Sequence, residues 1–369
     1  MKNLKDTRFI NQIEPSFGKE ESEALSKYIL SGGWGTEFKE TAKFEEGICG
    51  FTGAKYCSAV NNGTMALVIA LMAMGVQSGD EVIIPALTMV ATANAVVFLG
   101  AKPILADIDD NLCMDIDKTL ESINQKTKAI IYVSLNGRCG DIERLAKECK
   151  ERGIFLLEDA CQSLGSYHNG KSLGTFGDIG CYSLSPHKLI STGQGGLIVT
   201  NERQLADRVI RLKDFGRLSG GADVHNHFGI NSKFTDFQAV IGIEQMKKIE
   251  KRIETKRQIY FDYLYALHSI KAIEFLKRDT VNATTWFVDI YVDNRIELKQ
   301  YLSDNNIGTR AVYPLICDQP IYSELAGDFP MARKYSDRGL WLPSSVTLTD
   351  KDIKYVCDTI AKFYKGKNL

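Results

Sequence analysis

Short apolar runs alternate with stretches of helical length over the first 200 residues. Seven runs have the length and composition of buried strands: YCSAV (56–60), EVIIP (81–85), KPILAD (102–107), KAIIYV (128–133), IFLLED (154–159), GCYSL (180–184) and GLIVT (196–200). Apolar or amphipathic stretches between them predict helices over 64–75, 90–100, 142–153 and 204–216. Strands that alternate with helices form a mostly parallel sheet covered on both faces, so the pattern predicts an α/β fold.

The pattern changes near residue 240. A long charged stretch predicts one helix over 237–267, and further elements are predicted at 285–292 (strand), 295–306 (helix), 307–315 (extended segment) and 351–365 (helix). This is typical of a second, smaller α/β unit. We therefore expect a large domain over residues 1–245 and a small C-terminal domain over residues 246–369.

Charge and hydropathy exclude several classes of protein. The 45 Lys and Arg residues balance 46 Asp and Glu residues, which leaves a net charge of −1 and no electrostatic case for binding nucleic acid or an anionic membrane. No apolar run reaches the ~18 residues of a membrane span. The N-terminus lacks the apolar core of a signal peptide, and the nine cysteines contain no CxxC pair. We expect a cytoplasmic protein with reduced thiols.

Metal binding is not expected either. His225 and His227 in DVHNHF could chelate an ion, but no cysteine or HExxH partner accompanies them.

Polar residues that could bind a ligand or take part in catalysis follow the ends of the predicted strands, where ligand sites of such sheets lie. Gly63 permits a turn and Thr64 opens a helix, whose free N–H groups could bind phosphate, although a plain capped helix start explains the pair equally well. Asp159 ends an apolar run. A buried carboxylate there needs a positive partner, such as a protonated ring nitrogen. The alternative is an aspartate that only caps a helix. Gln162 could reach the same ligand.

Lys188 lies in CYSLSPHKLISTGQGG (181–196), among small hydroxyl residues that include Ser183 and Ser185. A lysine that is desolvated in such a site tends to lose its proton and become a nucleophile, whereas a lysine on a loop usually reaches water. A phosphate cradle, a deep acid and a lysine among hydroxyls together match pyridoxal phosphate (PLP), whose aldehyde condenses with a lysine amine.

These motifs resemble the DegT/DnrJ/EryC/StrS family of PLP-dependent sugar aminotransferases, which have the fold-type I architecture. The likeness runs over nearly the whole chain and includes SGGWGTEF, NNGTMALVIAL, LLEDACQSLGS, HKLISTGQGGLIVTN and GINSKFTDFQAVIGIEQ. The chain is most similar to the branch that makes 4-amino sugars, as perosamine synthases do from a nucleotide-linked 4-keto-6-deoxy sugar. The resemblance implies an amino-acid donor such as glutamate, pyridoxamine phosphate as the intermediate form of the cofactor, and a role in polysaccharide or glycoside biosynthesis.

The resemblance also implies roles for individual residues. Lys188 matches the lysine that bonds to the cofactor and moves the proton. Asp159 matches the acid that pairs with the pyridine nitrogen, and Gln162 matches the residue that bonds the phenolic oxygen. The phosphate would be held by Gly63, Thr64 and Ser183.

Asn231 matches an asparagine that reaches the phosphate from the neighbouring subunit, so the site would be complete only in a homodimer. Arg310 lies in a motif that the family associates with the sugar nucleotide. The resemblance adds Trp34, Ser185 and Lys233 as further candidates for substrate contact.

Four positions depart from the family pattern. Met89 stands where an aromatic ring usually stacks on the pyridine, and its thioether can still pack there. Gln194 replaces a common glutamate, Phe215 replaces a frequent histidine, and Cys317 replaces a histidine near the sugar. The chemical core is kept while its surroundings change, so the acceptor sugar stays open.

Two alternatives use the same cofactor. A sugar 3-dehydratase of this superfamily has histidine in place of the lysine, and His187 directly precedes Lys188 here. Counting back from STGQGG puts Lys188 on the catalytic position, which favours the aminotransferase. A regulatory protein that only binds PLP would not need the proton-transferring lysine.

A nicotinamide dehydrogenase, a third class, would need a GxGxxG motif that is absent.

Overall fold

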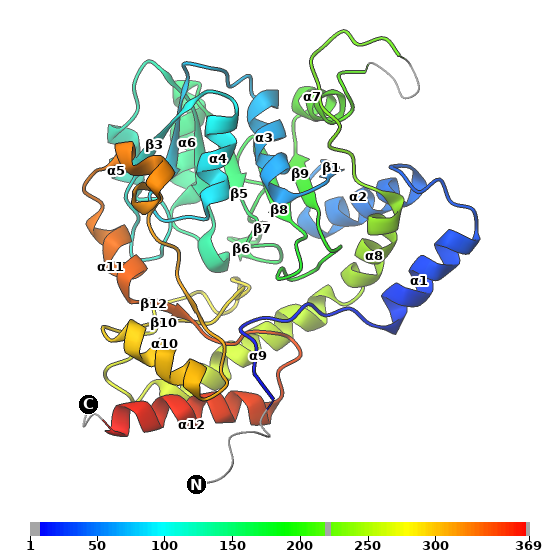
Figure 1. Ribbon diagram of the computed structural model, residues 1–369. Helices are drawn as coiled ribbons and strands as arrows, with labels where there is room; N and C mark the ends of the chain where they lie inside the picture. The colour runs from blue at the N-terminus through cyan, green and yellow to red at the C-terminus, as the bar shows by residue number, and fades with distance from the viewer. Residues whose placement is uncertain (1–7, 218–222, 367–369) are drawn as a thin grey trace.

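The computed structural model describes residues 8–217 and 223–366, and a seven-stranded sheet lies at its centre (Figure 1). The strand order is β1-β9-β8-β5-β4-β2-β3. Each strand matches a predicted one to within one residue at either end: β1 (Tyr56–Val60), β2 (Glu81–Pro85), β3 (Lys102–Ala106), β4 (Thr127–Val133), β5 (Phe155–Asp159), β8 (Ile179–Ser183) and β9 (Gly196–Thr200). The expected α/β architecture with a mostly parallel sheet is confirmed.

Strand β9 is the exception to the parallel arrangement. It pairs antiparallel with both β8 and β1, while β3, β2, β4, β5 and β8 run parallel to one another. The chain therefore turns back directly after β8 instead of crossing over through a helix. As a result the connection 184–195, which carries Lys188, stays at the edge where β1, β5 and β8 end.

Helices cover both faces of this sheet (Figure 1). The four predicted helices are present as α3 (Gly63–Ala73), α4 (Val90–Phe98), α6 (Ile142–Arg152) and α7 (Arg203–Lys213). The sequence pattern did not single out α1 (Lys19–Leu30), α2 (Lys39–Thr52) or α5 (Ile116–Glu121). Smaller elements are the hairpin β6 (Tyr167–His168) and β7 (Lys171–Ser172), and the turns η2 (Leu135–Gly137), η3 (Ile316–Asp318) and η4 (Pro320–Leu325).

The prediction of one helix over 237–267 was wrong. The chain forms α8 (Asp236–Met246) and α9 (Ile249–Leu267), with a break at Lys247 and Lys248. The N-terminal segment packs at this break: the Lys248 amine bonds Glu21 at 2.7 Å, and the Gln245 amide donates to the Ser16 carbonyl at 3.0 Å. These tertiary contacts hold the bend against the continuous helical pattern of the sequence.

A second, three-stranded antiparallel sheet lies in the C-terminal part, in the order β10-β12-β11. Its strands are β10 (Asp289–Tyr291), β11 (Arg310–Ala311) and β12 (Gly339–Trp341), accompanied by α10 (Arg295–Asp304), α11 (Pro330–Arg338) and α12 (Asp350–Gly366). Helix α12 forms the end of the molecule farthest from α3 and α4 (Figure 1). No helix in the described ranges combines the length and apolar character needed to cross a membrane.

The predicted strand over 285–292 is shorter than expected. Only Asp289–Tyr291 pairs as a strand, because the backbone of Phe287 bonds the side chain of Asn136 instead of a neighbouring strand. Trp286 and Phe287 thereby join the apolar core of the large sheet.

Candidate active site

A cleft of about 650 Å³ opens at the edge where β1, β5 and β8 end. The sequence-predicted residues that line it are Gly63, Thr64, Met89, Asp159, Gln162, Ser183, Ser185, Lys188, Gln194 and Arg310. These residues come from positions more than 240 apart in the chain, and the topology of the sheet brings them to one place. Sequence reasoning missed Cys161 and Tyr313, which also line the cleft.

The start of α3 can bind an anion. Asn62 caps the helix, and its side-chain oxygen accepts the N–H of Met65 at 2.9 Å. The N–H groups of Gly63 and Thr64 donate to no group in the described part of the chain, so they are free for a ligand. A Cβ at position 63 would lie 3.0 Å from Cβ of Ser183, so glycine lets the Ser183 side chain stand close to this helix end. This arrangement fits the phosphate of PLP.

Asp159 is a buried carboxylate that forms no ion pair among the described residues. It is 6% exposed; its Oδ2 accepts the hydroxyl of Thr92 at 2.8 Å and its Oδ1 accepts the N–H of Cys161 at 3.2 Å. No ion pair between described residues includes Asp159. Burying a carboxylate without a positive partner is costly. A protonated pyridine nitrogen is a partner that fits, so this residue also agrees with the cofactor.

Gln162 lies beside this carboxylate in the lining of the cleft. Its side-chain oxygen accepts the backbone N–H of Asn136 at 2.9 Å, which fixes the orientation of the amide. Its amide nitrogen donates to no other described residue and can donate to a ligand oxygen.

Lys188 has the electrostatics of a nucleophile. The pKa of its amine is lowered to about 8. Burial is the largest cause and the charge of Arg310 adds to it, while the nearby Cys161 and Asp159 oppose it. Its Nζ lies 4.0 Å from the centroid of the Trp286 ring. An amine with this pKa is partly neutral near neutral pH, as nucleophilic attack and proton transfer require.

His187, which directly precedes Lys188 and was weighed in the sequence as the mark of a dehydratase, also lines the cleft. Burial and the charges of Lys188 and Arg310 lower its pKa to about 4, so its ring is neutral. Its Nε2 lies 3.3 Å from the hydroxyl of Ser185, which lies 3.3 Å from that of Ser183. A row of neutral polar groups thus runs along one wall.

Arg310 and Met89 line other parts of the same cleft. The Arg310 guanidinium lies 5.4 Å from the ring centroid of Tyr313, and it forms no ion pair with an acid in the described ranges. It is therefore available to an anionic substrate. Met89 is 41% exposed, and its sulfur accepts the N–H of Ala91 at 3.0 Å.

Three predicted residues lie outside the cleft of the single chain. Asn231 is exposed and pairs as an isolated bridge with Asp214. The Lys233 amine bonds the Asp214 carboxylate at 2.9 Å. Trp34 is 75% exposed. The departures Phe215 and Cys317 do not line the cleft either.

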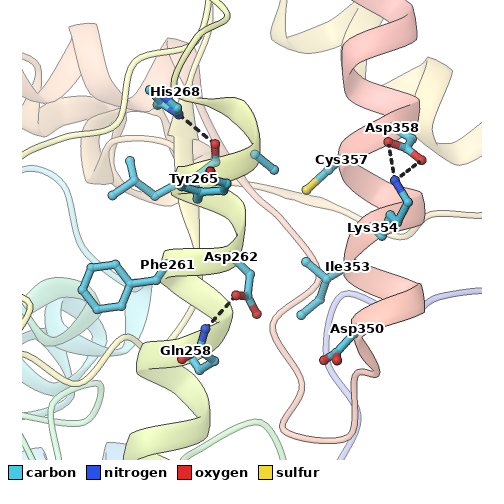
Figure 2. A pocket seen from close by; sticks show the side chains of 12 residues that line it. Gln258, Phe261, Asp262, Tyr265, His268, Asp350, Ile353, Lys354, Cys357 and Asp358 are labelled. Atoms are coloured by element: carbon cyan, nitrogen blue, oxygen red, sulfur yellow. Dashed lines mark hydrogen bonds and ion pairs between the residues drawn. The ribbon is translucent and has the colours of Figure 1, made fainter.

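A larger groove of about 1050 Å³ lies between α9 and α12 (Figure 2). Asp262 on α9 and Ile353 and Cys357 on α12 point into the groove there, whereas the ring of Phe261 points away from α12. None of the sequence-predicted site residues lines this groove. Among the described residues, no group of three or more His, Cys, Asp or Glu side chains could hold a metal ion.

Comparison with known proteins agrees with this geometry. The model of the DegT/DnrJ/EryC1/StrS aminotransferase family matches residues 15–361. A GDP-perosamine synthase of Escherichia coli O157:H7 is 34% identical over 364 residues, which cover 98% of this chain and 100% of the relative. A GDP-perosamine synthase of Vibrio cholerae is 33% identical and covers 95% of this chain and 98% of its own length.

Solved structures show the same fold. The aminotransferase TlmJ from Streptoalloteichus hindustanus superposes with a TM-score of 0.93 at 26% identity, over 98% of this chain and 100% of that one. DesV from S. venezuelae, solved in complex with a ketimine intermediate, superposes with a TM-score of 0.88 at 25% identity, over 93% and 94% of the two chains. This chain belongs to the DegT/DnrJ/EryC1/StrS aminotransferase family and is a PLP-dependent transaminase.

Proposed function

We propose that this transaminase moves an amino group from an amino acid, L-glutamate in the first instance, to the keto group of a nucleotide-linked deoxy sugar. The observation that carries the proposal is the cleft in which a buried lysine, a buried carboxylate that forms no ion pair with another described residue and the free start of α3 meet. The similarity to GDP-perosamine synthases over nearly the whole chain supports a 4-keto-6-deoxyhexose as the acceptor. The amino sugar would serve polysaccharide, such as O-antigen, or glycoside biosynthesis.

In this proposal the sequence-predicted residues of the cleft have defined roles. The bound cofactor supplies an electron-accepting ring that stabilises the charge left when the donor loses its α-proton. The Lys188 amine removes that proton and later returns one, as a base and then an acid. Asp159 keeps the ring nitrogen protonated, and the Gln162 amide donates to the ring oxygen. The phosphate is held by the N–H groups of Gly63 and Thr64 and by the Ser183 hydroxyl, and Met89 packs on the ring.

Substrate recognition is proposed for residues around this core. Arg310 binds an anionic group of the substrate, because it is a cation of the cleft without an acidic partner among the described residues. Ser185 offers a hydroxyl beside the neutral ring of His187. Trp34 and Lys233 contact substrate only if a second chain brings them to the cleft.

We further propose a homodimer in which Asn231 of one chain completes the site of the other. The exposed positions of Asn231 and Trp34, away from the cleft of their own chain, support this arrangement. We also propose two units, residues 1–245 and 246–369. The segment around Ile10 belongs to the first by sequence and packs with the second. The proposed compartment is the cytoplasm, in agreement with nine free cysteines.

The first experiment follows the absorption spectrum of the purified protein mixed with PLP and glutamate. We expect an absorption band of lysine-bound cofactor at ~420 nm, its loss on adding glutamate, and release of 2-oxoglutarate. Borohydride reduction followed by peptide mapping should place the cofactor on Lys188. Nucleotide-linked keto sugars are then tested for return of the band.

Three other outcomes would contradict parts of the proposal. Cofactor on a residue other than Lys188 removes the assigned site. Bound cofactor that no amino acid converts indicates a binding protein without turnover. A product that has lost water and carries no amino group identifies a keto-sugar dehydratase.

A further inference from the structure

The segment Thr284–Asp289 of the C-terminal part reaches the back of the cleft. Trp286 of this segment is 4% exposed, and its indole N–H donates to the carbonyl oxygen of His187 at 2.7 Å. That carbonyl belongs to the peptide bond that joins His187 to Lys188. The indole therefore fixes the backbone immediately before the lysine.

The ring of Trp286 also contacts the side chains of both residues. Its centroid lies 4.0 Å from the Lys188 amine and 5.6 Å from the centroid of the His187 ring. It is held in place by Phe287, stacked at 3.8 Å, and by Trp341, which meets it edge-on at 5.7 Å. The lysine thus rests on an aromatic face that cannot turn freely.

The neighbouring residue Phe287 reaches the other side of the site through Asn136. The Phe287 N–H donates to the Asn136 side-chain oxygen at 2.8 Å, and the Asn136 amide donates to the Phe287 carbonyl at 2.8 Å. The backbone N–H of Asn136 in turn donates to the side chain of Gln162 at 2.9 Å. Asn136 has a φ of +55°, a backbone conformation that asparagine tolerates better than most residues.

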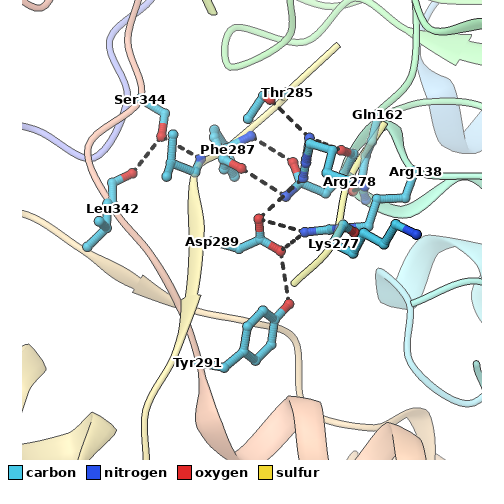
Figure 3. A network of polar contacts seen from close by, with 12 residues as sticks. Arg138, Gln162, Lys277, Arg278, Thr285, Phe287, Asp289, Tyr291, Leu342 and Ser344 are labelled. Carbon is cyan, nitrogen blue, oxygen red and sulfur yellow. Dashed lines mark hydrogen bonds and ion pairs between the residues drawn. The ribbon is translucent and has the colours of Figure 1, made fainter. Parts of the chain in front are cut away.

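A buried ionic cluster anchors the end of this segment (Figure 3). Asp289 accepts from Arg138 at 2.9 Å, from Arg278 at 3.2 Å and from the Tyr291 hydroxyl at 3.0 Å. Arg278 also donates to the Asn136 carbonyl at 3.0 Å. Separating one member from such a cluster would leave buried charge unpaired, so the cluster holds the end of the segment in place.

We propose that Thr284–Asp289 is a brace for the active site and that Trp286 is a positioning residue for Lys188. The inference rests on the proposed role of Lys188 as the lysine that bonds the cofactor. The Lys188 amine must move a proton between defined atoms, and such transfers lose rate steeply when the reacting groups are misplaced. One rigid segment sets the angle of Lys188 through Trp286 and that of Gln162 through Phe287 and Asn136.

The test replaces Trp286 by phenylalanine, which keeps an aromatic face and removes the indole N–H. The control is Val288→Ala, which loosens packing in the same segment and leaves the indole bond in place. Both variants are measured as the PLP-loaded protein by thermal unfolding, by circular dichroism in the cofactor band and by kcat and KM for the amino donor. We expect Trp286→Phe to lower kcat about five- to tenfold, the effect of one hydrogen bond, with KM nearly unchanged and a weaker cofactor dichroism.

Two results would overturn the brace without touching the proposed function. One is a Trp286→Phe protein with the kcat and dichroism of the wild type. The other is a Val288→Ala protein that loses both to the same extent, because the role of Trp286 would then be general packing. If borohydride fails to attach the cofactor to Lys188 in the wild-type protein itself, the proposed function fails and not only the brace.

Discussion

At Lys188, burial and charge act in opposite directions. Removal from water lowers the pKa of the amine, and the Asp159 carboxylate and Cys161 raise it, with a balance of about 8. The unfolded chain holds a proton at this position up to its ordinary pKa of 10.5. The buried lysine therefore destabilises the cofactor-free protein below about pH 8, and this penalty fades as the pH rises from 8 to 10.5.

Replacing Lys188 by methionine should therefore stabilise the cofactor-free protein. Methionine has a similar length and no charge, so we expect a gain of about 1–3 kcal/mol at pH 7 that shrinks toward pH 10. Denaturant unfolding at the two pH values measures it. Lys19→Met, at an exposed position, serves as the control and should give no pH-dependent gain. An equal gain at both pH values would show that burial of charge is not the cause.

Asp159 is predicted to matter for chemistry more than for stability. Asp159→Asn leaves a neutral side chain that cannot hold the proton of the ring nitrogen, so kcat should fall by about 10²-fold or more. Asp178→Asn is a matched control, since Asp178 is a partly buried carboxylate that bonds the Leu156 N–H outside the cleft. Steady-state kinetics separates the two. Similar losses in both variants would argue against a special role for Asp159.

At the scale of elements, the strands were predicted well because each is a buried apolar run bounded by polar residues. The position of the cleft could be predicted from the strand ends, because polar residues at the carboxyl edge of a parallel sheet lie close together. The break between α8 and α9 could not be predicted, because contacts with the distant residues Ser16 and Glu21 hold it. The same is true of Trp286 and Asn136, whose partners are remote in sequence. The family and the cofactor were confirmed by comparison, while the roles of single residues stay predictions.

The close approach of α3 and β8 leads to a prediction about cofactor affinity. Gly63→Ala places a methyl group 3.0 Å from Cβ and 3.2 Å from Oγ of Ser183, so the helix start must move away from the strand. We expect the affinity for PLP to weaken about tenfold, while the fold is kept. Equilibrium titration of the cofactor-free protein measures it. Gly47→Ala in α2, where the added methyl meets nothing within 4 Å, should leave the affinity unchanged.

At the scale of the whole molecule, the single chain presents a cleft with part of its predicted lining missing. Asn231, Lys233 and Trp34 lie outside it, and large apolar side chains are exposed on the same N-terminal segment and on α8, including Trp34, Phe38 and Phe237. Exposed apolar side chains in such numbers are typical of surfaces that meet a partner.

A complementation experiment tests whether the partner is a second copy. Lys188→Ala and Asn231→Ala should each reduce activity strongly. A mixture refolded together should regain about a quarter of the wild-type sites, because half of the dimers are hybrids and each hybrid has one intact site. Sedimentation should give a mass of twice 41.1 kDa. A mixture with only the average activity of the two variants would place Asn231 in its own chain's site.

The contacts of Phe287 and Asp289 have a consequence for protein engineering. A chimera that takes its C-terminal half from a relative with another sugar preference would carry foreign partners for Asn136 and Arg138. The buried Arg138 would then face no carboxylate wherever the relative lacks an acid at the position of Asp289. A functional exchange between relatives should therefore include the short loop 134–138 together with the C-terminal half, so that both sides of the junction come from the same parent.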